Sequence, residues 1–125
     1  MQVPSVKQGY TLIEIMLAFF VIAILMSGAY FIFNTLQYNA RKGKTETNLR
    51  LLQSQLELYN TKNDQYPKQL TDLVPREIPK LPKDGWDNDF YYKLTPGRKP
   101  PYQLYSYGPN GPGEGTPEER ISLQK

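Results

Sequence analysis

The chain contains no cysteine and no histidine, and it has one tryptophan among its 125 residues. These absences exclude a disulfide framework, the usual zinc sites and nucleophilic triads that depend on a histidine base. Because 15 basic residues nearly balance 12 acidic ones, the composition does not favour a nucleic-acid-binding protein. A chain of this length forms one domain at most.

Charge is scarce at the N-terminus, and proline is scarce in the first half. Lys7 and Glu14 are the only charged residues before Arg41, and a single proline precedes Pro67. From Pro67 to the C-terminus the sequence is rich in proline, glycine and tyrosine. The chain therefore divides into an apolar N-terminal part, a proline-poor middle and a C-terminal half with the composition of strands and turns.

A long apolar run over residues 10–33 follows the short leader MQVPSVKQG. Thr11, Glu14, Ser27 and Gly28 are its interruptions. As a helix the run would be roughly 36 Å long, which is enough to cross a hydrocarbon core of about 30 Å. We therefore expect this segment to span a membrane.

Three interpretations of the apolar run compete. A secretory signal would be cut after the small residues that end at Ala29, but this would leave the apolar residues 30–33 exposed at the new terminus. A plain signal anchor needs no cut. Neither of these two explains an acidic side chain, Glu14, inside the apolar stretch.

The third interpretation explains the glycine and the acid together. The run GYTLIE, from Gly9 to Glu14, resembles the processing site of type IV pilins and pseudopilins, where a short basic leader ends in glycine before a long apolar helix. In that family a membrane-embedded prepilin peptidase cuts after the glycine, and the new amine is methylated. The resemblance implies a leader over residues 1–9, cleavage between Gly9 and Tyr10, and methylation of Tyr10.

Glu14 is the candidate assembly residue. A charged side chain at the centre of a bilayer costs about 2.5–3.5 kcal/mol, so an acid in such a segment is a functional candidate. Cleavage would leave the Tyr10 amine as a cation at the same depth. We expect Glu14 of one subunit to pair with the Tyr10 amine of a neighbour in a filament. The alternative is a Glu14 that is merely solvated at the membrane interface.

The middle of the chain predicts a helix with one apolar stripe. Leu49, Leu52, Leu56 and Tyr59 follow a helical spacing, and no proline separates them from the membrane segment. We therefore predict one continuous helix from about residue 11 to about residue 62, roughly 80 Å long.

The C-terminal half predicts short elements. A short helix is expected over residues 68–74, a hairpin of strands over 89–94 and 102–107, and a third strand over 121–123. The predicted fold class is α+β, in which the C-terminal half of a long membrane-spanning helix packs against a small antiparallel sheet of about three strands.

Three landmarks narrow the resemblance to one branch. They are YP at Tyr66, LPKDGWDN from Leu81 and SYGPNG from Ser106, which in this order are similar to the major pseudopilin of type II secretion systems. The resemblance implies a pilin-type fold, with a membrane and assembly helix over residues 10–33 and a periplasmic domain over residues 34–125, held at the inner membrane.

The resemblance also implies a function without enzymatic activity. The chain would polymerise with minor pseudopilins into a periplasmic pseudopilus that drives export of folded proteins, and it would meet prepilin peptidase and an inner-membrane secretion platform. A minor type IV pilin, a DNA-uptake pseudopilin and a membrane-anchored binding module remain alternatives. A catalytic carboxylate pair among Asp84, Asp87 and Asp89 is the least favoured, because acids at such a loop-to-strand junction are usually solvated.

The chain departs from this family at two places. Phe31 stands where members usually carry proline, and Asn110 stands where the calcium-binding loop usually carries aspartate. The family's loop binds calcium, and the Leu104 carbonyl, Asn110, Glu118 and Glu119 could still supply oxygen ligands for it here. A glycine and proline loop held together without metal is the alternative.

Overall fold

The computed structural model of the chain describes residues 9–123. The predicted leader therefore lies outside the described residues, apart from Gly9. The chain forms two compact units, of which the first ends at Gln37 and the second begins at Tyr38.

A single helix, α1 (Leu12–Asn63), has 52 residues and confirms the predicted continuous helix. It remains helical at Phe31, as expected where the sequence has no helix-breaking proline. After its last residue, Asp64 adopts a left-handed conformation with φ 57°. The Asp64 amide donates to the Asn60 carbonyl at 2.8 Å, which ends the helix with a satisfied carbonyl.

In the first unit, α1 exposes its apolar side chains. Leu12 is 75% exposed, Phe20 64% and Phe31 73%. Among the described residues, α1 is the helix that is long and apolar enough to cross a membrane. Because exposed apolar surface costs roughly 25 cal/mol per Å² in water, this part of the helix requires lipid or other protein around it.

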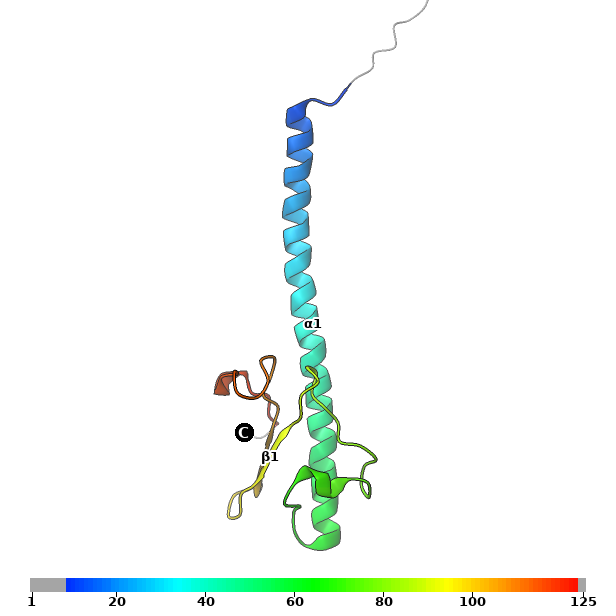
Figure 1. Ribbon diagram of the computed structural model, residues 1–125, viewed down its shortest axis with the longest axis vertical. Helices are drawn as coiled ribbons and strands as arrows, with labels where there is room; N and C mark the ends of the chain where they lie inside the picture. Colours follow the sequence, from blue (N-terminus) through cyan, green and yellow to red (C-terminus); the bar gives the residue numbers. More distant parts are fainter. Residues whose placement is uncertain (1–8, 124–125) are drawn as a thin grey trace, which may run out of the picture. The chain divides into compact units, whose positions relative to one another are not determined.

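The second unit has its own hydrophobic core, built on the predicted stripe. Leu49, Leu52 and Leu56 of α1 are each at most 1% exposed. They share one core with residues of the C-terminal half: Leu73, Ile78, Phe90, Tyr102, Leu104 and Ile121. Figure 1 shows the hairpin beside the C-terminal part of α1.

The sheet consists of β1 (Tyr91–Leu94) and β2 (Tyr102–Tyr105), which pair antiparallel with Tyr91 opposite Tyr105. On β2, Tyr102 and Leu104 are buried while Gln103 and Tyr105 are partly exposed. This alternation is the two-residue period of a strand with one face on the core. The predicted hairpin is therefore confirmed.

The predicted strand count was slightly too high. Within residues 9–123, the segment that starts at Ile121 forms one bridge to Ser106, with N–O distances of 2.9 and 3.0 Å, and no strand. A short 3-10 helix, η2 (Pro117–Glu119), comes just before this bridge and leaves little room for a ladder. Likewise, the helix expected over 68–74 is the 3-10 helix η1 (Leu70–Leu73), which lies between Pro67 and Pro75.

The buried tyrosines predict a pH dependence for the second unit. Burial raises the pKa of Tyr102 from 10.0 to about 12. Burial also raises the pKa of Tyr92, whose hydroxyl donates to the Pro67 carbonyl at 2.6 Å. Because the raised pKa favours the neutral phenol in the fold, its contribution to stability is complete below about pH 10 and is lost as the pH rises towards 12.

We therefore expect the second unit to unfold between about pH 10 and 12, together with ionisation of its buried tyrosines. Emission from the single tryptophan, Trp86, reports unfolding, and tyrosinate absorbance reports ionisation. Tyr102→Phe should move the unfolding midpoint to higher pH. Full ionisation of all tyrosines near pH 10, with Trp86 emission unchanged, would contradict this expectation.

Candidate functional site

Glu14 and Thr11 form a reciprocal cap at the start of α1. The Thr11 amide donates to Glu14 Oε2 at 3.2 Å, and the Glu14 amide donates to Thr11 Oγ1 at 3.3 Å. Two backbone amides that have no partner within the helix are thereby satisfied. This capping role was not predicted from the sequence, although threonine followed three residues later by glutamate is its usual signal.

The same carboxylate lies in a shallow groove on one side of α1. The groove is lined by Tyr10, Glu14, Ile15, Ala18, Phe19 and Ile22. Tyr10 is 84% exposed, and a side chain at Gly9 would meet nothing within 4 Å. The structure therefore brings Tyr10 and Glu14 together in one accessible apolar groove, with Gly9 uncrowded beside it.

Asp84 is a buried carboxylate that holds the loop ahead of β1. It is 0% exposed, and its Oδ1 accepts the amides of Trp86 and Asn88 at 3.0 and 2.9 Å. Its Oδ2 accepts the Ser106 hydroxyl at 2.6 Å, which ties the loop to the end of β2. Asp84 is therefore a structural crosslink, and the expectation of a solvated acid was wrong for this position.

The residue after Asp84 seats the same loop on α1. The Gly85 amide donates to Thr45 Oγ1 at 2.8 Å, and this hydroxyl in turn donates to the Arg41 carbonyl at 2.8 Å. A Cβ at Gly85 would overlap the Arg41 carbonyl oxygen, so only glycine fits this close approach. Thr45 is 0% exposed and extends the leucine stripe of α1 with a polar contact.

Two alanine substitutions should therefore change stability in opposite directions. Gly85→Ala should destabilise the second unit by about 1–3 kcal/mol, because the loop must move off α1. Gly43→Ala should stabilise it by roughly 0.5–1 kcal/mol, since Gly43 lies in the helix with open space around it. Thermal denaturation of both variants in detergent, followed by Trp86 emission, measures the difference. A stable Gly85→Ala protein would contradict the proposed close packing.

The C-terminal loop brings together only part of the predicted calcium ligand set. Asn110 Nδ2 donates to Glu119 Oε1 at 2.7 Å, and Glu119 Oε2 accepts the Thr116 amide at 2.8 Å. Glu118 is exposed, and the Leu104 carbonyl accepts the Ser122 hydroxyl at 3.2 Å. Within residues 9–123, no group of three or more acidic, histidine or cysteine residues is placed to hold a metal ion.

This donor arrangement does not fit an oxygen-ligated cation. A calcium ion takes six to eight oxygen ligands, so an asparagine ligand must present its amide oxygen. Here Asn110 presents its amide nitrogen to the carboxylate that would share the ion.

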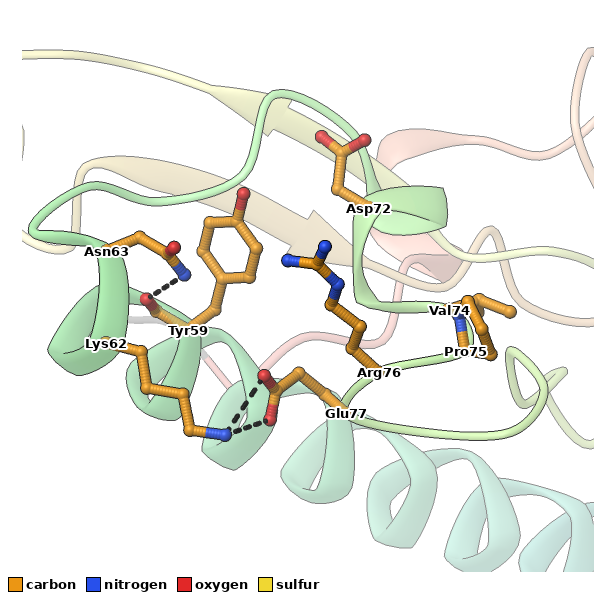
Figure 2. A pocket seen from close by; sticks show the side chains of 8 residues that line it. All are labelled: Tyr59, Lys62, Asn63, Asp72, Val74, Pro75, Arg76 and Glu77. Carbon is orange, nitrogen blue, oxygen red and sulfur yellow. Dashed lines mark hydrogen bonds and ion pairs between the residues drawn. The ribbon is translucent and has the colours of Figure 1, made fainter.

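An open hollow, which was not predicted from the sequence, lies where α1 ends (Figure 2). Lys62 Nζ, in the last turn of α1, lies 3.1 Å from Glu77 Oε2. The Glu77 side chain is only 8% exposed, so this ion pair fastens the loop after η1 to the helix. Arg76 extends into the hollow from the same loop. The residues of this hollow therefore hold the loop against α1, which is a structural role.

Comparison with known families identifies the chain. A family model described as type II secretion system (T2SS), protein G, matches residues 33–123, and a model of the prokaryotic N-terminal methylation motif matches residues 4–30. The first of these covers well over half of the chain. The chain belongs to the type II secretion system protein G family. It is thus a structural pseudopilin subunit of the secretion system, anchored in a membrane, and its family is not one of enzymes.

Individual relatives agree with this membership of the protein G family. The type II secretion system core protein G of Vibrio cholerae is 33% identical, and the match covers 88% of this chain and 87% of the relative. That of Dickeya chrysanthemi is 30% identical, over 84% and 79% respectively. The crystal structure of the major pseudopilin of enterohaemorrhagic Escherichia coli matches with a TM-score of 0.54 at 28% identity, covering 66% of this chain and 85% of that one.

Proposed function

We propose that the chain is the major subunit of a periplasmic pseudopilus that drives export of folded proteins across the outer membrane. Prepilin peptidase cuts between Gly9 and Tyr10, and Tyr10 is then methylated. Residues 10–33 hold the subunit in the inner membrane before assembly, and residues 34–125 lie in the periplasm. Its partners are further copies of itself, minor pseudopilins and the inner-membrane secretion platform.

The observation that carries this proposal is the groove that joins Tyr10 and Glu14 at the start of α1, where the surrounding residues are apolar and exposed. Lipid alone can cover the apolar side chains, as it would in a plain membrane anchor. Lipid offers no partner for a carboxylate at this depth, whereas the Tyr10 amine of a neighbouring subunit would neutralise it. Assembly therefore explains why residue 14 carries a charge, which the cap on the Thr11 amide does not require.

Mass spectrometry of the mature protein tests the processing step. We expect the chain to begin at Tyr10 and to carry one added methyl group on its amine, when prepilin peptidase is present. Gly9→Val should keep the leader attached without altering α1, because Gly9 precedes the helix. A mature protein that begins just after Ala29, as a secretory signal would produce, would contradict the proposal.

A further inference from the structure

The C-terminal loop over residues 106–121 is closed by contacts that need no metal ion. We propose that an amide–carboxylate pair, Asn110 with Glu119, takes the place of a divalent cation in this loop, so that the second unit folds independently of calcium. This inference concerns the second unit alone and does not depend on filament assembly.

Protein contacts close the loop at its base. The Ser106 amide donates to the Ile121 carbonyl at 2.9 Å, and the Ile121 amide donates to the Ser106 carbonyl at 3.0 Å. Two residues further into the loop from this Ser106–Ile121 pair, Gly108 has φ +82°, and a Cβ there would overlap the Glu119 carbonyl. The two arms of the loop, residues 106–110 and 116–121, thus contact each other through their backbones near the base, which leaves no gap for an ion there.

Beyond this base, Glu119 holds the loop together with both of its carboxylate oxygens. Oε1 accepts from Asn110 on one arm, while Oε2 accepts from the Thr116 amide at the start of η2. A carboxylate can only accept hydrogen bonds, so its chemistry requires Asn110 to turn its nitrogen inward. The bond to the ionised group is charge-assisted and stronger than one between neutral groups.

The asparagine also changes the charge balance of the loop. An aspartate at position 110 would place a second carboxylate against Glu119, and like charges at hydrogen-bond distance repel strongly. A cation would then be needed to hold the two arms together. With Asn110 the pair carries a single negative charge, and Arg120, whose guanidinium lies 4.7 Å from the Tyr105 ring centroid, supports the same arm.

Calcium titration of the full chain in detergent micelles tests the inference. Two readouts are used: the melting temperature from Trp86 emission, and amide hydrogen exchange of the loop. We expect the melting temperature to be the same in millimolar calcium as in a chelator, and the exchange rates of the loop amides to be the same in both conditions. A rise of about 5 °C or more in calcium, or calcium-dependent protection of the loop amides, would overturn the inference.

Variants that change the charge at position 110 or 119 give a second test, which does not depend on comparing the wild-type chain with and without calcium. Asn110→Asp should lower the melting temperature by about 5 °C in chelator, and calcium should restore it. The double variant Asn110→Asp with Glu119→Gln reverses the pair, since the new glutamine can still accept from Thr116 and donate to position 110. We expect it to melt like the wild type without calcium.

Glu118→Gln is the matched control, because Glu118 is the neighbouring exposed acid. It should change neither the melting temperature nor the calcium response. The inference is overturned if Asn110→Asp melts like the wild type in chelator, if the double variant remains as unstable as Asn110→Asp, or if Glu118→Gln lowers the melting temperature in chelator as much as Asn110→Asp does.

Discussion

Glu14→Ala and Glu14→Gln should both abolish filament assembly while leaving processing and membrane insertion intact. At a separation of 4 Å and an effective dielectric constant of about 20, two unit charges attract by about 4 kcal/mol. A filament repeats this pair at every subunit. Since about 1.4 kcal/mol corresponds to a tenfold change in an equilibrium constant, assembly should fall below detection. Electron microscopy and sedimentation of sheared filaments measure the loss.

The glutamine variant separates assembly from helix capping. In the structure Glu14 accepts the Thr11 amide, and the neutral amide oxygen of glutamine can do the same. Thr11→Ala is the converse control, because it removes the hydroxyl that accepts the Glu14 amide and keeps the charge. We expect Thr11→Ala to assemble and Glu14→Gln not to. Normal filaments from Glu14→Gln would leave the carboxylate with a capping role only.

Asp84→Ala should unfold or nearly unfold the second unit. The substitution leaves the Trp86 and Asn88 amides and the Ser106 hydroxyl without their acceptor in a buried position. Each of the three lost bonds to this charged group is worth about 1.5–3 kcal/mol, so a total loss of about 4.5–9 kcal/mol is expected. Typical domains have a stability of only about 5–15 kcal/mol. Thermal denaturation in detergent, followed by Trp86 emission, measures the effect.

Two matched variants show whether the crosslink is the cause. Asp84→Asn keeps one oxygen for the two amides and should lose about 1–2 kcal/mol. Asp89→Ala removes an exposed acid that lies 3.8 Å from Lys83, and it should change stability by less than about 0.5 kcal/mol. If Asp84→Ala melts within a few degrees of Asp89→Ala, the buried network does not hold the loop.

The elements with a strong local pattern were predictable from the sequence. The leucine spacing from Leu49 to Leu56 predicted both the helix and the face that is buried. The alternation around Tyr92 and Tyr102 predicted the hairpin. These predictions succeed because apolar side chains that share one face recur every 3.6 residues in a helix and every 2 residues in a strand, and this spacing can be read within a short segment.

The features that were missed depend on contacts between distant segments. The burial of Asp84 depends on Ser106, which is 22 residues away, and no local pattern distinguishes it from the exposed Asp87 and Asp89. The third strand was predicted from the short segment that starts at Ile121. The structure has a bridge between Ile121 and Ser106 there instead, because η2 occupies the preceding residues. Long-range contacts of this kind decide which polar side chains become structural.

Cryo-electron microscopy of filaments formed by the processed chain, with the proposed secretion platform and minor subunits present, tests assembly through Glu14 most directly. We predict density that places the methylated Tyr10 amine within roughly 4 Å of the Glu14 carboxylate of a neighbouring subunit, with the apolar helices packed together at the filament centre. Filaments in which Glu14 faces solvent or lipid, or a processed chain that stays monomeric in the membrane, would contradict it.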